Sequence, residues 1–310
     1  MPDIAVFGSL NMDLVVRVPR VPEAGETLHA HSFMDNPGGK GGNQAVACAR
    51  MGASVSMIGR VGDDAFGQAL KASLARDGIA VDHVCTAPAS TGVALIMVDD
   101  SAQNRIALIP GANAFVGAED THRLQRELAT ARLLLLQFEV PMPAVLDAAA
   151  LASARGCTVV LNPAPAQTMP DALWALVDIL VLNEVEAAML AGCEVHDAAG
   201  AARAAEALRG RGPSDVILTL GSQGVVACSA SGCRHFSALD VKAVDTTAAG
   251  DTFIGALCAA LVRGESIDDG IALGTRAAAL CVTRAGAQAS IPARAEAEAL
   301  ALPARRSIAP

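Results

Sequence analysis

Residues 245–252 read Asp-Thr-Thr-Ala-Ala-Gly-Asp-Thr and lead directly into a long apolar run, residues 253–262. We expect a loop of small residues that opens a helix here. The first N–H groups of a helix have no intrahelical partner, and the helix dipole adds partial positive charge. The backbone of Ala248, Ala249 and Gly250 is therefore suited to hold an anion such as a phosphate group.

Asp251 is the unexpected residue in this segment, because a carboxylate should repel an anion bound there. One chemistry resolves the conflict. The carboxylate takes a proton from a nucleophilic hydroxyl while the amides hold the charge that develops on a transferring phosphoryl group. The alternative is that Asp251 only caps the helix, as aspartate often does in a first turn. The octapeptide by itself leaves both interpretations open.

A second cluster, residues 37–44, places four glycines in eight positions directly before the apolar segment 45–51. Glycines let a backbone approach a ligand closely, and Lys40 and Asn43 offer donors that suit hydroxyl groups. The order differs from a Walker A phosphate loop, because Gly41 follows Lys40 where that motif has Ser or Thr. A flexible turn is the alternative interpretation.

Two polar residues, Asn11 and Asp13, follow a predicted strand over residues 4–7. Ligands bind at the carboxyl ends of the strands in open parallel sheets, so this pair is a candidate for ligand contacts. An Asx turn that closes the strand is the alternative.

Four apolar segments, 133–138, 158–161, 179–182 and 216–220, alternate with the helix-like segments 144–154, 184–190 and 198–209. This alternation predicts a parallel sheet covered by helices on both faces. Polar residues at the strand ends should meet at one edge of that sheet. They are Glu139, Asn162, Asn183, Glu186, Thr219, Gly221 and Ser222. Each one alone is equally typical of a cap or a turn.

A smaller sheet is predicted apart from the main one. Residues 14–36 alternate loosely around prolines and a glycine, and residues 93–98 and 106–109 flank a polar turn, as in a β-hairpin. Towards the C-terminus, residues 271–282 predict a closely packed helix. The Ala-, Glu- and Arg-rich tail from residue 293 predicts one terminal helix.

Composition excludes several classes of protein. A length of 310 residues suits one large α/β domain or two smaller ones. A net charge of −9 and only 3% aromatic residues argue against a nucleic-acid binder. No apolar run is long enough to span a membrane and no signal peptide is evident, so we expect a cytoplasmic protein. The eight cysteines lack metal-site spacing, and we expect them to be buried free thiols.

Together these motifs resemble the ribokinase, or PfkB, family of carbohydrate kinases. The resemblance rests on the segments 38–45 and 245–253, on Asn183-Glu184-Val185-Glu186, and on the segments 90–95, 161–166, 220–225 and 283–290. It implies one α/β domain over residues 1–310, a ribokinase-like three-layer sandwich with a mostly parallel central sheet. A small β-sheet lid, residues 12–37 and 90–110, would be inserted in it.

The implied activity is ATP-dependent phosphorylation of D-ribose at its 5-hydroxyl, with Mg²⁺ and K⁺. The resemblance makes Asp251 the base and Ala248, Ala249 and Gly250 the anion hole. It assigns the sugar to Asn11, Met12, Asp13, Gly39, Lys40, Gly41, Gly42, Asn43, Glu139 and Asp251. It assigns the nucleotide to Asn183, Thr219, Leu220, Gly221, Ser222, Gln223, Gly224, Gly250, Asp251 and Thr275.

The same resemblance implies two metal sites. A monovalent cation would be held, mostly by backbone carbonyls, at Asp245, Thr247, Cys281, Arg284, Gly286 and Ser290, and Asn183 and Glu186 would support magnesium. It further implies a homodimer formed through the lid, with no nucleic-acid or membrane partner. Two alternatives remain: a relative that phosphorylates deoxyribose, a ketohexose or a nucleoside, and a sugar sensor without catalytic activity.

Overall fold

The computed structural model describes residues 1–101, 103–301 and 306–307. In this part of the chain the main sheet has ten strands in the order β14-β13-β12-β11-β10-β9-β8-β1-β4-β5. The strands from β5 to β11 are parallel, and β12, β13 and β14 form an antiparallel edge. Their bounds are β1 Ile4–Phe7, β4 Val55–Gly62, β5 Ala80–Ala87, β8 Leu133–Gln137, β9 Thr158–Asn162, β10 Ile179–Asn183, β11 Asp215–Thr219, β12 Val225–Ser229, β13 Gly232–Phe236 and β14 Arg306–Ser307.

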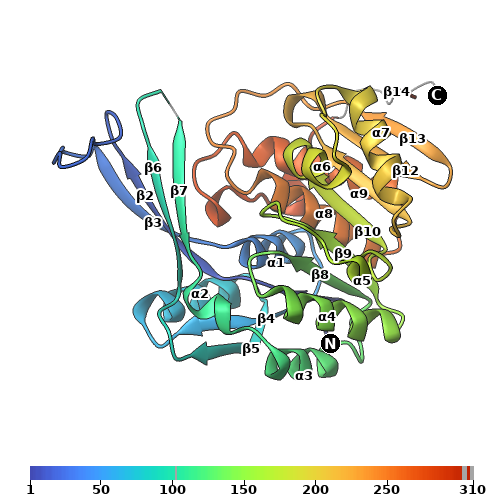
Figure 1. The fold of residues 1–310 in the computed structure, drawn as a ribbon, viewed down its shortest axis with the longest axis horizontal. Helices are drawn as coiled ribbons and strands as arrows, with labels where there is room; N and C mark the ends of the chain where they lie inside the picture. The colour runs from blue at the N-terminus through green and yellow to red at the C-terminus, as the bar shows by residue number, and fades with distance from the viewer. Residues whose placement is uncertain (102, 302–305, 308–310) are drawn as a thin grey trace.

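Helices cover both faces of this sheet (Figure 1). One face packs against α3 Ala118–Glu127, α4 Met142–Ala154, α5 Asp171–Trp174, α6 Glu184–Ala191 and α7 Ala198–Arg209. The other packs against α1 Lys40–Arg50, α2 Ala65–Arg76, α8 Ala249–Val262 and α9 Ile267–Cys281. The short helix α10 Arg294–Glu298 lies against α9. The predicted three-layer sandwich is confirmed.

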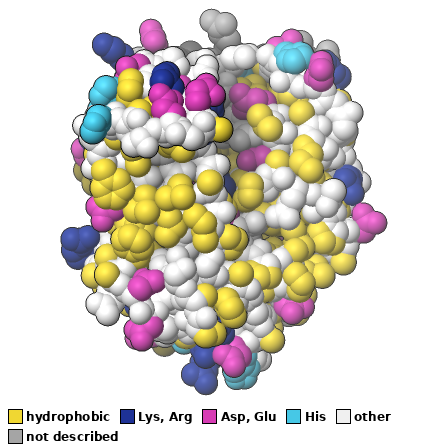
Figure 2. All heavy atoms as spheres, turned by 60° about the vertical axis from the view of Figure 1, so that its left-hand side comes forward, with side chains coloured by type: hydrophobic (Ala, Val, Ile, Leu, Met, Phe, Trp, Pro, Cys, Tyr) yellow, Lys and Arg dark blue, Asp and Glu magenta, His cyan; other side chains and the backbone are white. Residues whose placement is uncertain are grey.

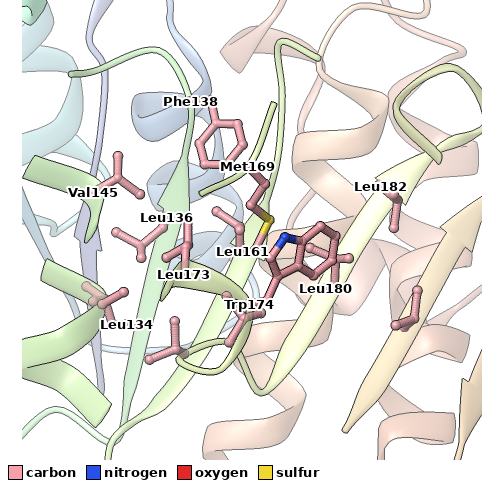
Figure 3. Packing of buried hydrophobic residues seen from close by; sticks show 14 of the residues in the cluster. Leu134, Leu136, Phe138, Val145, Leu161, Met169, Leu173, Trp174, Leu180 and Leu182 are labelled. Carbon is pink, nitrogen blue, oxygen red and sulfur yellow. The ribbon is translucent and has the colours of Figure 1, made fainter. Parts of the chain in front are cut away.

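The two cores divide the side chains of each central strand. Along β8, Leu134 and Leu136 belong to one core, while Leu133 and Leu135 belong to the other. Figure 3 shows Leu134 and Leu136 in the first core, which also holds Trp174. Because both faces of a central strand are buried, its sequence is a continuous apolar run instead of an alternating one.

A second sheet, which we call the lid sheet, projects from one side of the molecule (Figure 1). It contains β3 Ser32–Gly38, β2 Asn11–Arg17, β6 Gly92–Val98 and β7 Asn104–Ile109, in that order. Strand β2 pairs antiparallel with β3 and parallel with β6, and β6 and β7 form the predicted hairpin. Figure 2 shows hydrophobic side chains gathered on this side of the molecule, and the exposed ones include Phe33, Leu95, Ile106 and Leu108.

Two predictions are wrong. Cys228 and Cys233 are not free thiols but form a disulfide, because they are direct partners in the β12–β13 pair and their Cα atoms lie 4.1 Å apart. Nor are all the other thiols buried, since Cys193 is exposed.

The tail from residue 293 also differs from the one terminal helix that its composition predicts. Its helix ends at Glu298, and Arg306–Ser307 then pairs with β13, while residues 302–305 and 308–310 lie outside the described part of the chain. Among the helices of the described residues, none is long and apolar enough to cross a membrane.

Candidate active site

The polar residues that end the parallel strands meet the first turns of α1 and α8 at one edge of the main sheet. A cavity of about 210 Å³ lies there, and its lining includes Asn162, Asn183, Glu186, Thr219 and Asp251. Lys40 lines it from α1, and Ala248, Ala249 and Gly250 line it from the start of α8. The structure thus brings together residues that lie more than 200 positions apart in the chain.

Glu139 is the centre of a cluster next to this cavity. Its Oε2 accepts hydrogen bonds from Ser9 Oγ at 2.5 Å, from the Lys40 backbone N–H at 3.0 Å and from Asn11 Nδ2 at 3.4 Å. The carboxylate therefore ties the turn after β1 to the N-terminus of α1. Asn113 completes the cluster: its Nδ2 donates to Asn11 Oδ1 at 2.7 Å and fixes the direction of that amide.

Sequence reasoning missed Ser9 and Asn113. The 3₁₀ helix η1 Gly111–Phe115 carries Asn113, which is buried and also exchanges hydrogen bonds with the backbone of Leu10. A single Asn in a polar loop gives no signal in a sequence, because its partner is 102 residues away.

Glycine is required where α1 meets the turn after β1. Gly39 has a φ of 84°, and a Cβ there would lie 2.6 Å from the backbone nitrogen of Asn11. A Cβ at Gly41 would lie 2.6 Å from the nitrogen of Ser9. This close approach brings Lys40 and Asn43 to the residues of β2. Met12, by contrast, is buried in the hydrophobic core and does not line the cavity.

Asp251 lies in the first turn of α8, is 8% exposed, and has both carboxylate oxygens occupied. Asn43 Nδ2 donates to Oδ2 at 3.0 Å, and Gln44 Nε2 donates to Oδ1 at 2.9 Å. The helix begins after Ala248, which has a left-handed φ of 60°. This turn leaves the following amides at the open end of the helix, where N–H groups have no intrahelical acceptor.

Lys40 is the cation at the centre of four carboxylates. Burial alone would lower the pKa of Lys40, but Asp251, Glu139, Glu186 and Asp13 together raise it. Burial, followed by the charges of Glu139 and Asp251, raises the pKa of Asp13 to about 7 against the opposing effect of Lys40. The negative charges exceed the positive one, so the site favours hydroxyl donors and cations, and a phosphate needs the α8 amides to enter it.

A second, more apolar cavity of about 350 Å³ adjoins the first. Several residues predicted for the nucleotide line it: Thr219, Gly221, Ser222, Gly224, Gly250 and Thr275. Two of the predicted residues point elsewhere. Gln223 donates from Nε2 to the backbone oxygen of His196 at 3.2 Å, and Leu220 is buried in the core. The Thr275 hydroxyl donates to the Ile271 carbonyl within its own helix, so it presents mainly a methyl group.

Asn183 and Glu186 form a capping box at the start of α6. Asn183 Oδ1 accepts from the Val185 and Glu186 backbone N–H groups, and Glu186 Oε2 accepts from the Asn183 backbone N–H, each at 2.9 Å. Burial raises the pKa of Glu186. One carboxylate, with its partner amide engaged in the cap, fits a magnesium ion that keeps several waters and binds phosphate oxygens.

The residues predicted for the monovalent cation connect the segments 245–247 and 281–290. Asp245 accepts from the backbone N–H groups of Thr247 at 2.9 Å and Gly286 at 3.0 Å. Burial alone would raise the pKa of Asp245, but hydrogen bonds from the Thr247 side chain and from these two backbone N–H groups lower it.

Oxygen atoms of these two loops are candidate ligands for a large monovalent ion. The Thr247 carbonyl accepts from the Cys281 thiol, a weak donor, at 3.6 Å, and that thiol lies 3.0 Å from Ser290 Oγ. The Thr247 carbonyl is an oxygen ligand of the kind that a large monovalent ion takes, whereas Ser290 Oγ already donates to the Ala287 carbonyl at 2.7 Å. The Arg284 side chain pairs with Glu296 and so leaves only its backbone for this role.

Comparisons with known proteins agree with this geometry. The family model "pfkB family carbohydrate kinase" matches residues 1–294. A ribokinase of Haemophilus influenzae is 42% identical over 294 residues, covering 94% of this chain and 96% of the relative. A deoxyribokinase of Salmonella typhi is 37% identical over 292 residues, covering 94% of this chain and 95% of the relative.

A solved structure supports the same relationship. The ribokinase of Arabidopsis thaliana complexed with ribose and ATP is 31% identical and superposes with a TM-score of 0.88. The match covers 96% of this chain and 97% of that chain. With a family model and relatives that match nearly end to end, the chain belongs to the pfkB family of carbohydrate kinases.

Proposed function

We propose that the protein is an ATP-dependent ribokinase that phosphorylates the 5-hydroxyl of D-ribose. The observation that carries the proposal is the position of Asp251, which lies between the amide donors of α1 and the N-terminal backbone amides of α8. A carboxylate at the N-terminus of a helix is useful when a hydroxyl must lose a proton as a phosphoryl group arrives. The ribokinase of Arabidopsis thaliana, solved with ribose and ATP, supports the choice of substrates.

Asp251 would accept the proton of the attacking hydroxyl on its Oδ2, which lies on the Asn43 side. The amides that follow Ala248 would hold the charge on the phosphoryl group, and Lys40 would balance charge between sugar and phosphate. Magnesium would supply charge neutralisation on the phosphates, supported through water by Glu186 and Asn183. Little covalent chemistry remains for the protein, so positioning and electrostatics would dominate.

The acceptor would be a small polyol. Every sugar hydroxyl that loses water needs a partner, and Asn11, Asp13, Lys40, Gly39 and Glu139 supply charges and amides at one place. Asn43 Oδ1 is buried without a hydrogen-bond partner, which leaves an acceptor for a sugar hydroxyl. A nucleoside acceptor is less well supported, because it would need an apolar shelf for its base. The two aromatic side chains of the lid region, Phe33 and Phe115, are both exposed and so do not form an enclosed shelf.

Deoxyribose is the second candidate acceptor, because the deoxyribokinase of Salmonella typhi is 37% identical to this chain. The two sugars differ by one hydroxyl. A site that pairs that hydroxyl would reject the deoxy sugar, because a buried group would lose its partner.

The proposal extends to a monovalent cation and to a dimer. Potassium would bind the oxygens of the loops around Thr247 and Ser290, and its role would be to hold the backbone that leads into α8. The lid sheet would cover the sugar and contact a second copy of the chain, supported by its exposed apolar side chains. We further propose a cytoplasmic location, where ATP and free sugar meet.

The first experiment measures ADP release from ATP with D-ribose, with and without potassium, against 2-deoxyribose, fructose and adenosine. Fast turnover on ribose that rises with potassium is the expected result. Turnover on another acceptor alone would keep the kinase mechanism and refute the ribose assignment. Ribose binding without turnover on any acceptor would favour a sugar sensor instead.

A further inference from the structure

Gln44 is buried completely and follows Asn43 on the first turns of α1. Its amide makes three hydrogen bonds. Nε2 donates to Asp251 Oδ1 at 2.9 Å and to Asn162 Oδ1 at 3.2 Å, and Oε1 accepts from Gln137 Nε2 at 2.6 Å. Both amide hydrogens and the amide oxygen are therefore in use.

The direction of this amide is fixed from outside the active site. Asn162 Nδ2 donates to the Val181 backbone oxygen at 3.0 Å, so its Oδ1 must face Gln44. Gln137 and Asn162 are direct partners at the ends of β8 and β9, so two neighbouring strands hold Gln44 from below. A flipped Gln44 amide would set its oxygen against the carboxylate of Asp251 and against Asn162 Oδ1, at a cost in buried polar groups.

We propose that Gln44 is a positioning residue for the phosphoryl transfer, holding Asp251 Oδ1 so that Oδ2 faces the sugar hydroxyl, with Gln137 and Asn162 setting the direction of its amide. This inference rests on the proposed function and deepens it. The two oxygens of the carboxylate then have different surroundings. Oδ1 is held by an amide anchored in the sheet, while Oδ2 is held by Asn43, which we place among the sugar contacts.

An amide suits this position better than a cation. It fixes the carboxylate through a hydrogen bond, without adding a second positive charge beside Lys40. Other titratable groups also face Asp251 from the elements around it: Lys40 on α1, Asp13 on β2, Glu186 on α6 and the Cys281 thiol on α9. None of these four is changed by a substitution at Gln44.

The test compares Gln44→Met, Gln44→Glu and Gln137→Met with the wild-type protein, using kcat over a range of pH and calorimetric binding of D-ribose. Methionine keeps the length of the side chain but donates no hydrogen bond. For Gln44→Met we expect kcat to fall by about 10²-fold, the loss that a small misplacement of a catalytic group can cause. Ribose affinity should change little, and the acid limb of the kcat profile should move to higher pH.

Gln44→Glu should move that limb further, because a second carboxylate then opposes ionisation of Asp251. Gln137→Met should give a smaller loss of kcat of the same kind, since the donor to Asp251 remains but can rotate. Gln68→Met, on the exposed side of α2, is the matched control and should behave as wild type. Thermal unfolding checks that each variant is folded, and Gln137→Met decides the question if Gln44→Met does not fold.

Wild-type kcat and an unmoved acid limb in both Gln44→Met and Gln137→Met would refute the positioning role while leaving the proposed function intact. So would a loss of ribose affinity that accounts for the whole loss of turnover. A wild-type protein that releases no ADP with any sugar would refute the proposed function, and the inference with it.

Discussion

Asp251 is the residue on which the proposed chemistry depends most. Replacing it with asparagine keeps the size of the side chain but removes the proton acceptor. We expect Asp251→Asn to lower kcat by about 10²–10⁴-fold, the usual contribution of general base catalysis. Steady-state kinetics and calorimetry should show the loss in turnover with D-ribose binding largely retained. Near-wild-type turnover would contradict the assignment of the base.

If Asp13 contacts the sugar as proposed, we expect sugar binding to depend on pH in the neutral range. Its pKa is raised from 3.8 to about 7, first by burial and then by neighbouring carboxylates. The stability that the protonated group gives the fold is complete below its ordinary pKa and is lost as the pH rises through about 7. The affinity for the sugar should change with pH in the opposite direction, because a sugar hydroxyl donates its hydrogen bond to the ionised carboxylate.

The affinity for D-ribose should therefore rise from about pH 6 to about pH 8, by at most about tenfold per pH unit. Calorimetric titration of the protein with D-ribose at several pH values measures this change in affinity. Asp13→Asn cannot ionise, so its affinity should be weaker and independent of pH over this range. A wild-type affinity that is flat with pH would show that Asp13 is not the titrating contact.

At the same residue scale, sequence reasoning found the chemical groups but not their supports. Asp251, Lys40 and Glu139 stand out because charged residues rarely occur among small or apolar ones. Gln137 is visible only as one polar interruption of an apolar strand, and Gln44 only as the residue after Asn43. Their hydrogen bonds depend on the rotation of α1 against the sheet, which no local pattern encodes.

At the scale of elements, α1 and α8 must pack very closely to bring Asn43 and Gln44 to Asp251. A Cβ at Gly255 would lie 2.3 Å from Ala47 Cβ and 2.8 Å from the Cys48 nitrogen. We expect Gly255→Ala to lower the free energy of unfolding by about 1–3 kcal/mol, the usual cost of overpacking. Because the helices must separate, kcat should fall as well.

Urea denaturation and steady-state kinetics measure both effects. Gly210→Ala is the control, since its Cβ would meet its nearest neighbour at 3.4 Å, an ordinary contact, and should change neither quantity. If the Gly255→Ala variant unfolds at the same urea concentration as the wild-type protein, the methyl group does not overpack the contact between α1 and α8, and the prediction is wrong.

Elements with a strong pattern were predictable. Helix α7 has the predicted bounds, because an apolar stripe and an aspartate cap define it locally. The Cys228–Cys233 bond and the short β14 were not predictable, because both depend on how strands are registered against one another. A cysteine spacing does not determine which residues face each other across a hairpin.

At the scale of the whole molecule, the lid sheet leaves a large apolar surface exposed. Phe33 is 61% exposed and Ile106 is 59% exposed, and the strand registers place them on opposite faces of the sheet. We expect a dimer in solution that buries one of these faces. Analytical ultracentrifugation of Phe33→Asp and Ile106→Asp should show that one of them is a monomer.

Met189→Asp, at an exposed apolar residue of α6 outside the lid sheet, is the control and should remain a dimer. A monomeric wild-type protein would refute the dimer. Two aspartate variants that both stay dimeric would show that the contact lies elsewhere.

Strand β2 carries Asn11 and Asp13 at its start and runs on into the exposed lid sheet, whereas the cavity proposed for the nucleotide is lined by loops that follow β11 and by α8 and α9. The specificity for the sugar and the specificity for the phosphate donor are thus unequal targets for laboratory evolution. Ser222 is exposed and open to exchange for a new phosphate donor, whereas Gly224 is not, because its φ is 95° and a Cβ there would lie 2.0 Å from the backbone oxygen of Phe236. A new sugar requires changes in a strand that also shapes the apolar surface, so we expect selection for a different acceptor to change that surface at the same time.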